Sequence, residues 1–205
     1  MSEKQTNNNY YSTIEKSAVA EFKDRGSRFI AFAFPISDVN DFKEKMAAIK
    51  KEHPKATHHC FAYRLGLDGM SYRVSDAGEP SGTAGRPILG QIDSKQLTNV
   101  LIIVVRYFGG TLLGVPGLIN AYKSSAAMAL QITPSVQKPV LANYRLHFSY
   151  MQMNDVMRII KHFECVMYKQ DLQLFCHIEI GVPRIRLQEV LTMLNDIQSL
   201  EVEQG

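Results

Sequence analysis

The stretch Asn99–Gly114, NVLIIVVRYFGGTLLG, joins the longest apolar run of the chain to a glycine-rich loop. Its Val- and Ile-rich first half predicts a buried strand over Asn99–Arg106, because β-branched side chains favour strands. The run Val100–Val105 is far shorter than the ~20 residues that a membrane-spanning helix needs. We therefore expect a globular α+β fold that contains this strand, with the glycine-rich loop leading into a helix.

Patterns on both sides of this strand predict the rest of one domain. Two apolar-rich runs between Thr13 and Ile36 flank the turn sequence Asp24–Ser27, which predicts a β-hairpin. Apolar residues then recur at helical spacing from Ser37, the expected helix cap, to Lys51. The remaining expected elements are strands over 58–67 and 70–75 with a turn at Asp68-Gly69, and helices over 87–97 and 118–132.

The last third of the chain predicts a second, smaller domain. Its strands are expected over 140–150, 164–169, 172–182 and 200–202, and its helices over 152–163 and 184–196, in the order βαββαβ. One antiparallel sheet with both helices on one side, the ferredoxin-like arrangement, satisfies this order in ~65 residues. Pro134 and Pro139 break regular structure, so we expect a flexible tail at 1–12 and domains at 13–135 and 139–205.

Composition favours a reducing compartment and places the excess positive charge in the first domain. The cysteines Cys60, Cys165 and Cys176 are odd in number and lie in apolar surroundings, which indicates reduced core thiols. The first residues lack the apolar run of a signal peptide, so we expect a cytoplasmic protein without a membrane partner. Residues 1–138 hold 17 Lys/Arg against 12 Asp/Glu, whereas residues 139–205 hold 6 against 8. An anionic partner would therefore meet the first domain.

Glycines concentrate in two loops of the first domain, 76–86 and 106–114. Glycine loses the most conformational entropy on folding, so it is favoured where φ is positive or where another group approaches the backbone closely. Each loop leads from a strand into a helix and so directs backbone N–H groups toward an anion. The candidate anion- or RNA-binding residues are Ser81, Gly82, Thr83, Gly85, Arg86, Arg106, Tyr107, Phe108, Gly109, Gly110, Thr111 and Lys123.

The same loops carry a family resemblance. The segments Ser75–Leu89, SDAGEPSGTAGRPIL, and Val105–Gly114, VRYFGGTLLG, resemble the two diagnostic segments of the Impact family, in its bacterial YigZ-like branch. Supporting segments are Ser27–Ala31, His58–Arg64 and Gly117–Tyr122, so the resemblance covers most of residues 13–130.

This resemblance implies a fold and a biological setting. The first domain is expected to have the fold of the second domain of ribosomal protein S5, and the second domain to be similar to the last ferredoxin-like domain of elongation factor G. Eukaryotic relatives regulate translation initiation by competing for the activator of a nutrient-stress kinase, and the bacterial branch is suspected of binding RNA or the ribosome. We therefore expect a non-catalytic protein without a cofactor that binds RNA, the ribosome or an acidic protein surface, with no DNA sequence specificity.

A small hydrolase remains open as an alternative. Asp76 and Glu79 could share a proton, and His58 or His59 could act as a base on a phosphorylated or peptide-like substrate. A metal site is not expected here, because adjacent strand residues point to opposite faces and His58, His59 and Cys60 cannot converge on one ion.

A protein-interaction module is the other alternative. Arg145, His147 and Ser149 alternate with apolar residues and leave one potentially polar sheet face in the second domain. A partner could dock on that face or on the edge of the same sheet.

Overall fold

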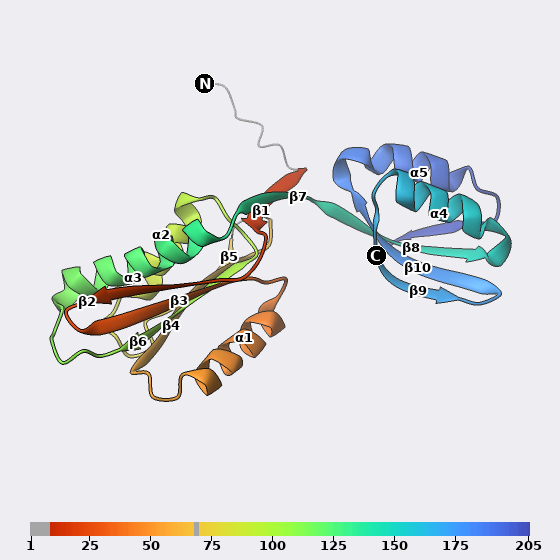
Figure 1. Cartoon of the computed structure of the whole chain (residues 1–205). Coiled ribbons are helices and arrows are strands. Elements are labelled where there is room, and N and C mark those ends of the chain that lie inside the picture. The colour runs from red at the N-terminus through yellow and green to blue at the C-terminus, as the bar shows by residue number, and fades with distance from the viewer. Residues whose placement is uncertain (1–8, 68–69) are drawn as a thin grey trace, which may run out of the picture. The chain divides into compact units, whose positions relative to one another are not determined.

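The chain divides into two compact units, which a computed structural model describes for residues 9–67 and 70–205 (Figure 1). The N-terminal unit spans Tyr11–Gln137, and the C-terminal unit spans Lys138–Gly205 together with Asn9 and Tyr10. Each unit combines helices with an antiparallel sheet, which confirms the predicted α+β class.

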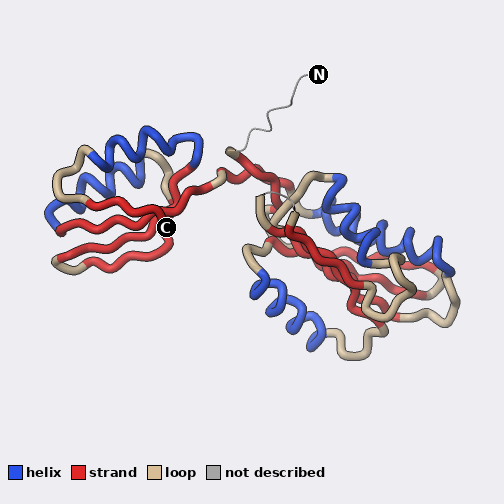
Figure 2. Tube along the Cα trace, turned by 180° about the vertical axis from the view of Figure 1, so that it is seen from behind, coloured by secondary structure: helices blue, strands red, loops and turns tan. Residues whose placement is uncertain are grey.

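The N-terminal unit is built on a five-stranded antiparallel sheet in the order β2-β3-β6-β4-β5. Figures 1 and 2 show helices on both faces of this sheet, with α1 on one face and α2 and α3 on the other. The strands are β2 (Ala18–Asp24), β3 (Ser27–Pro35), β4 (His58–Leu65), β5 (Ser71–Ser75) and β6 (Val100–Tyr107), and the helices are α1 (Val39–Glu52), α2 (Gly85–Ser94) and α3 (Gly114–Ile132).

Both faces of the sheet are buried at its central strands, and they differ in side-chain size. On the central strand β6, Ile102 packs beneath α2 and α3, and its neighbour Ile103 packs beneath α1. Adjacent strands place Ala31 and Ala62 on the α2/α3 face and Phe32 on the α1 face. The small residues let two helices approach the sheet, and the larger ones fill the space beside a single helix. Because β6 is covered on both sides, its sequence is continuously apolar.

The cap of α1 differs from the prediction by one residue. Asp38, not Ser37, is the N-cap, and its carboxylate accepts hydrogen bonds from the amides of Asn40 and Asp41 at 2.6 and 3.0 Å. The backbone of Asp38 is extended, with φ −151°, as a capping residue requires. A carboxylate at this position also interacts favourably with the positive end of the helix dipole.

Two element boundaries are also corrected. Helix α3 begins at Gly114 and not at Leu118, because Pro116 is tolerated in a first helical turn. Strand β1 (Tyr10–Ile14) pairs with strand β7 (Ser135–Pro139), so residues 10–12 and the region of the expected linker contain strands. The turn expected at Asp68-Gly69 lies outside the described residues.

The C-terminal unit has the predicted βαββαβ order. Its four-stranded antiparallel sheet has the order β11-β8-β10-β9, and α4 and α5 pack on one face of it around Leu146, Ile178 and Val190. This topology confirms the ferredoxin-like arrangement. The elements are β8 (Leu141–Ser149), α4 (Met153–His162), β9 (Val166–Leu172), β10 (Phe175–Pro183), α5 (Leu187–Asn195) and β11 (Glu201–Gln204), with short 3₁₀ helices η1 (Tyr150–Gln152) and η2 (Arg184–Arg186).

Two properties concern the chain as a whole. All three cysteines are free thiols, and Cys60 and Cys176 are buried, as expected for core residues. In the part of the chain described, no helix is long and apolar enough to cross a membrane.

The double coverage of β6 gives a stability prediction. We expect Ile102→Ala and Ile103→Ala each to lower the free energy of unfolding by about 2–5 kcal/mol, because each removes a fully buried side chain from a different core. The measurement is urea unfolding followed by circular dichroism. Val19→Ala, at a side chain 53% exposed on β2, is the control and should cost less than about 1 kcal/mol. A small effect of either Ile variant would show that one face is not packed as described.

Candidate functional site

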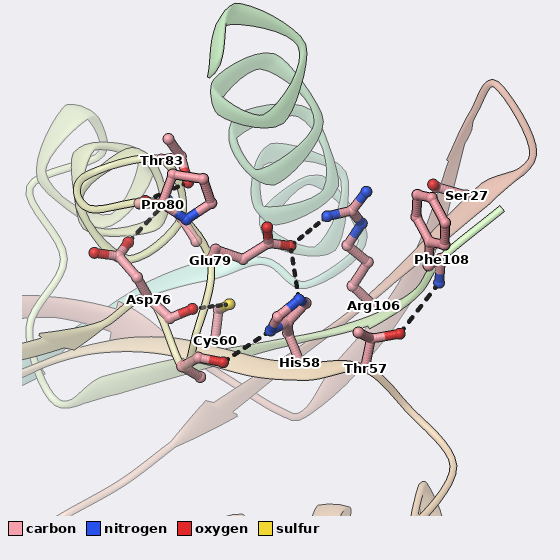
Figure 3. A network of polar contacts seen from close by, with 12 residues as sticks. Ser27, Thr57, His58, Cys60, Asp76, Glu79, Pro80, Thr83, Arg106 and Phe108 are labelled. Carbon is pink, nitrogen blue, oxygen red and sulfur yellow. Dashed lines mark hydrogen bonds and ion pairs between the residues drawn. The ribbon is translucent and has the colours of Figure 1, made fainter. Parts of the chain in front are cut away.

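The two glycine-rich loops lie beside a shared cavity at one end of strands β4 and β6. Figure 3 shows three of its lining side chains, Glu79, His58 and Arg106, directed toward one another. One loop, residues 76–84, leads into α2, and the other, residues 108–113, leads into α3. The cavity has a volume of about 430 Å³ and is lined by both loops, by His58 and Arg106, and by the start of α3. We call it the loop pocket.

Asp76 organises the first loop from within. Its carboxylate accepts hydrogen bonds from the amides of Gly82, Ala84 and Gly85 at 2.9, 3.0 and 2.8 Å. Burial raises the pKa of this carboxyl, but the three amide hydrogen bonds, with a smaller contribution from Arg86, outweigh burial and lower the pKa overall. The amides at the start of α2, which the sequence assigned to an external anion, are therefore already taken by a side chain of the same loop.

Glu79 places a second carboxylate at the pocket. Its side chain is buried and forms an ion pair with Arg106, whose Nη1 lies 2.6 Å from Oε1. The hydroxyl of Tyr122 donates to the same oxygen at 2.7 Å. This arrangement joins the first loop to β6 and α3, and it makes Arg106, a candidate anion-binding residue, a buried cation paired with Glu79.

Tyr122 and Cys60 extend this network into the core. The thiol of Cys60 lies 3.3 Å from the Tyr122 hydroxyl and 3.0 Å from the carbonyl oxygen of Asp76, which are the two acceptors within reach of its single proton. Burial raises the pKa of the Cys60 thiol to about 12, and burial together with Cys60 and Glu79 raises the pKa of Tyr122. Both groups stay protonated at neutral pH, so they serve as hydrogen-bond donors and not as nucleophiles.

The two adjacent histidines are separated by the sheet, as predicted. The ring nitrogen Nδ1 of His58 lies 2.8 Å from the carbonyl oxygen of Ala77, and Nε2 lies 3.8 Å from Glu79 at the pocket. His59 is directed to the other face, where its Nε2 lies 3.2 Å from the carbonyl oxygen of His53. Burial lowers the pKa of His59, so this side chain is neutral at pH 7. It lies beside His53 and not beside Asp76 and Glu79.

The second loop is held by close backbone packing. A Cβ atom on Gly109 would lie 1.9 Å from the carbonyl carbon of Gly26, so only glycine fits beside the β2–β3 turn. The amide of Gly109 donates to Ser27 Oγ at 3.1 Å. Phe108 next to it is 48% exposed, whereas Tyr107 is half-buried and its hydroxyl lies 2.9 Å from Nδ1 of His53. Of the two aromatic residues in the candidate RNA-binding set, Phe108 is therefore the accessible one.

The other predicted ligand-binding residues differ in exposure. Thr83 is buried, and its hydroxyl donates to the carbonyl oxygen of Pro80 at 2.6 Å. The exposed members of the set are Ser81, Arg86, Phe108, Gly109, Gly110, Thr111 and Lys123.

The pocket also holds an unsatisfied donor. Nε of Arg106 is buried and has no hydrogen-bond partner among the residues that the structure describes. The guanidinium lies over the rings of Phe29 and Phe108, 5.4 and 5.6 Å from their centroids. A buried donor without a partner costs about 1–3 kcal/mol, so a ligand oxygen that reached this nitrogen would be stabilised.

Tyr122 was the main residue that sequence reasoning missed. It lies in the segment Gly117–Tyr122, which supported the family resemblance, but a tyrosine in an alanine-rich helix gives no sign of its partner. Glu79 and Tyr122 are 43 residues apart, and only the packing of α3 on the sheet brings them together.

The ion pair gives a second stability prediction. Glu79→Gln keeps the side-chain shape but leaves the Arg106 charge buried without a partner, and we expect a loss of about 3–5 kcal/mol in the free energy of unfolding. Urea unfolding at pH 7 measures it. The control is Glu21→Gln, which breaks the exposed pair with Arg28 and should cost far less. Equal losses in the two variants would contradict the structural role of the buried pair.

Asp76 gives a pH prediction. Because folding lowers its pKa, this carboxylate stabilises the fold above its unfolded value of about 3.9, and the stabilisation is lost as pH falls through the folded value. Asp76→Asn should therefore be less stable than wild type at pH 7, and the difference should shrink below about pH 4. Thermal unfolding of both proteins between pH 7 and pH 3 measures the difference. A difference in stability that does not change with pH would show that the charge of the Asp76 carboxylate does not stabilise the loop.

Known proteins match this chain over most of its length. A model of the Impact N-terminal domain matches residues 25–130. An IMPACT family member from Haemophilus influenzae is 33% identical over 91% of this chain and 92% of its own length. The IMPACT family member YigZ of Escherichia coli is 32% identical over 87% of this chain and 91% of its own length. The crystal structure of a hypothetical protein, 29% identical, matches with a TM-score of 0.76 over 96% of this chain and 98% of that one.

The matched regions contain the features described above. The family model includes both glycine-rich loops and the buried cluster of Glu79, Arg106 and Tyr122. The two bacterial relatives match over at least 87% of the chain and so extend into the C-terminal unit. On these grounds, the chain belongs to the Impact family.

Proposed function

We propose that this chain is a non-catalytic, translation-linked binding protein of the cytoplasm that binds RNA through the α2/α3 side of its N-terminal unit. Proteins of the Impact family are linked to the regulation of translation. The sequence resemblance implies the same setting here, and the finer assignment to RNA comes from the exposed cations and from the loop pocket.

The non-catalytic part of the proposal rests on the hydrogen bonds that both loop carboxylates accept within the protein. Asp76 accepts three backbone amides, and Glu79 Oε1 receives both Arg106 and Tyr122. A general acid or base must exchange its proton with a substrate, whereas these carboxylates hold the loops in place. His58, 3.8 Å from Glu79, keeps a hydrolase as the second candidate, since its Nε2 faces a polar partner at the pocket.

Exposed cations and an exposed ring support an anionic, base-bearing ligand. Arg86 stands in the first turn of α2, and Lys123 stands on α3, which covers the same sheet face. Such side chains neutralise phosphates. Phe108 at the pocket rim offers a ring for base stacking.

The proposal predicts a side-specific loss of RNA binding. In Arg86→Ala/Lys123→Ala we expect weaker binding to single-stranded RNA and a salt slope smaller by about 1.4, because two phosphate contacts are lost. Fluorescence anisotropy across a salt series, with labelled single- and double-stranded RNA and with ribosomes tested by sedimentation, measures both quantities.

The matched control is Lys50→Ala/Lys51→Ala, which removes the same charge from α1 on the opposite sheet face. It should bind RNA like the wild type. An equal loss of RNA affinity in both double variants would show that binding depends on net charge and not on the α2/α3 side. Absence of wild-type binding at low salt would overturn the RNA assignment and favour an acidic protein partner.

A further inference from the structure

The outward face of the C-terminal sheet carries a second cluster of chemically active side chains. Helices α4 and α5 cover one face of this sheet, and Figure 1 shows no helix of the unit on the other face. Along β8 and β10, Leu146 and Ile178 point into the core, so their neighbours His147 and His177 point outward. His147 is half-buried, and His177 is exposed.

Strand register places four titratable residues in one row across this face. His177 lies directly opposite His147 on β8 and opposite Asp171 on β9, and His147 lies opposite Glu201 on β11. The row therefore reads carboxylate, imidazole, imidazole, carboxylate. The next row holds Lys169, Glu179, Arg145 and Glu203, in which the charge alternates.

The imidazole rings of His147 and His177 meet at their Nδ1 atoms. Nδ1 of His147 and Nδ1 of His177 are in direct hydrogen-bonding contact, and the ring centroids are 4.6 Å apart with an interplanar angle of 74°. Two neutral Nδ1 atoms can share one proton, but each also carries a lone pair when that proton is absent. Imidazole nitrogen binds Zn²⁺ at about 2.0–2.1 Å, so small side-chain rotations would let one ion replace the shared proton.

The surroundings favour a cation and place a carboxylate near one of the two imidazoles. Nε2 of His147 lies 3.8 Å from a carboxylate oxygen of Glu203. Metal-bound histidines commonly donate their second ring N–H to a carboxylate, which fixes the tautomer and the ring orientation. The two rows hold four carboxylates against the two cations Arg145 and Lys169, so with neutral histidines the local charge is negative. A cavity of about 220 Å³ lies over the same residues and leaves room for water ligands.

We propose that His147 and His177 form a binding site for a divalent transition-metal ion, with Zn²⁺ as the reference ion, on the open face of the C-terminal sheet. The ion is held by the two Nδ1 atoms, and water completes its coordination. Glu203 acts as a positioning residue through Nε2 of His147. In the described ranges, no group of three or more His, Cys, Asp or Glu side chains is arranged to hold a metal, so this is a two-histidine site and not a closed structural one.

Imidazole ligands set the expected selectivity. They suit Zn²⁺, Ni²⁺ and Cu²⁺, whereas Mg²⁺ prefers oxygen ligands. A protonated imidazole cannot bind a metal ion, so the affinity for Zn²⁺ should fall as the pH is lowered.

Calorimetric titration of the untagged full-length chain with Zn²⁺ at pH 7.5 tests the site. We expect one saturable site per chain, lost in His147→Ala and in His177→Ala, and no binding of Mg²⁺. Glu203→Gln should keep the site but weaken it by about tenfold. Because these side chains are on the surface, the variants should keep the wild-type circular dichroism spectrum.

A measurement with Cu²⁺ and a control variant at another histidine complete the experiment. Electron paramagnetic resonance of one equivalent of Cu²⁺ should show hyperfine coupling to two nitrogens in the wild type and to fewer in either single variant. His162→Ala, at an exposed histidine of α4, should behave like the wild type in both measurements. The proposal is overturned if the wild type shows no saturable Zn²⁺ binding, or if His147→Ala/His177→Ala binds Zn²⁺ as the wild type does.

Discussion

A buried ion pair fixes how a loop, a strand and a helix of the N-terminal unit lie relative to one another. Glu79 comes from a loop, Arg106 from the end of the central strand, and Tyr122 from the helix that follows, and the three meet at one carboxylate oxygen. A charge removed from water is strongly destabilising once its charged partner is lost. The loop, the strand and the helix therefore keep one relative arrangement, and the loop pocket takes its shape from that arrangement.

The regular elements could be predicted because their signals are local. The apolar run of β6 and the βαββαβ order of the C-terminal unit follow from periodicity within each segment. The opposite directions of His58 and His59 likewise follow from the two-residue repeat of a strand. The cap of α1 was misplaced because Ser37 and Asp38 are adjacent and both are good caps, so the choice depends on backbone geometry that the sequence does not contain.

The site itself was only partly predictable. The glycine clusters located it, since Gly109 must lie against Gly26 and Gly82 has a positive φ of 78°. The sequence predicted that the loop amides bind an external anion, whereas they donate to Asp76 of the same loop. A loop that directs several N–H groups at one point does not reveal whether the anion there is a ligand or one of its own side chains. The pairing of Glu79 with Tyr122, like that of His147 with His177, depends on contacts between segments distant in sequence.

The burial of the thiols has a practical consequence for following the motions of the native protein. Alkylating reagents attack the thiolate, and burial raises the pKa of Cys60 to about 12 and that of Cys165 to about 11. Cys176 is shielded by full burial. Cys60 lies in one unit and Cys176 in the other, and both are fully buried, so the slow alkylation of these two residues, resolved by peptide mass, measures the opening of each unit separately.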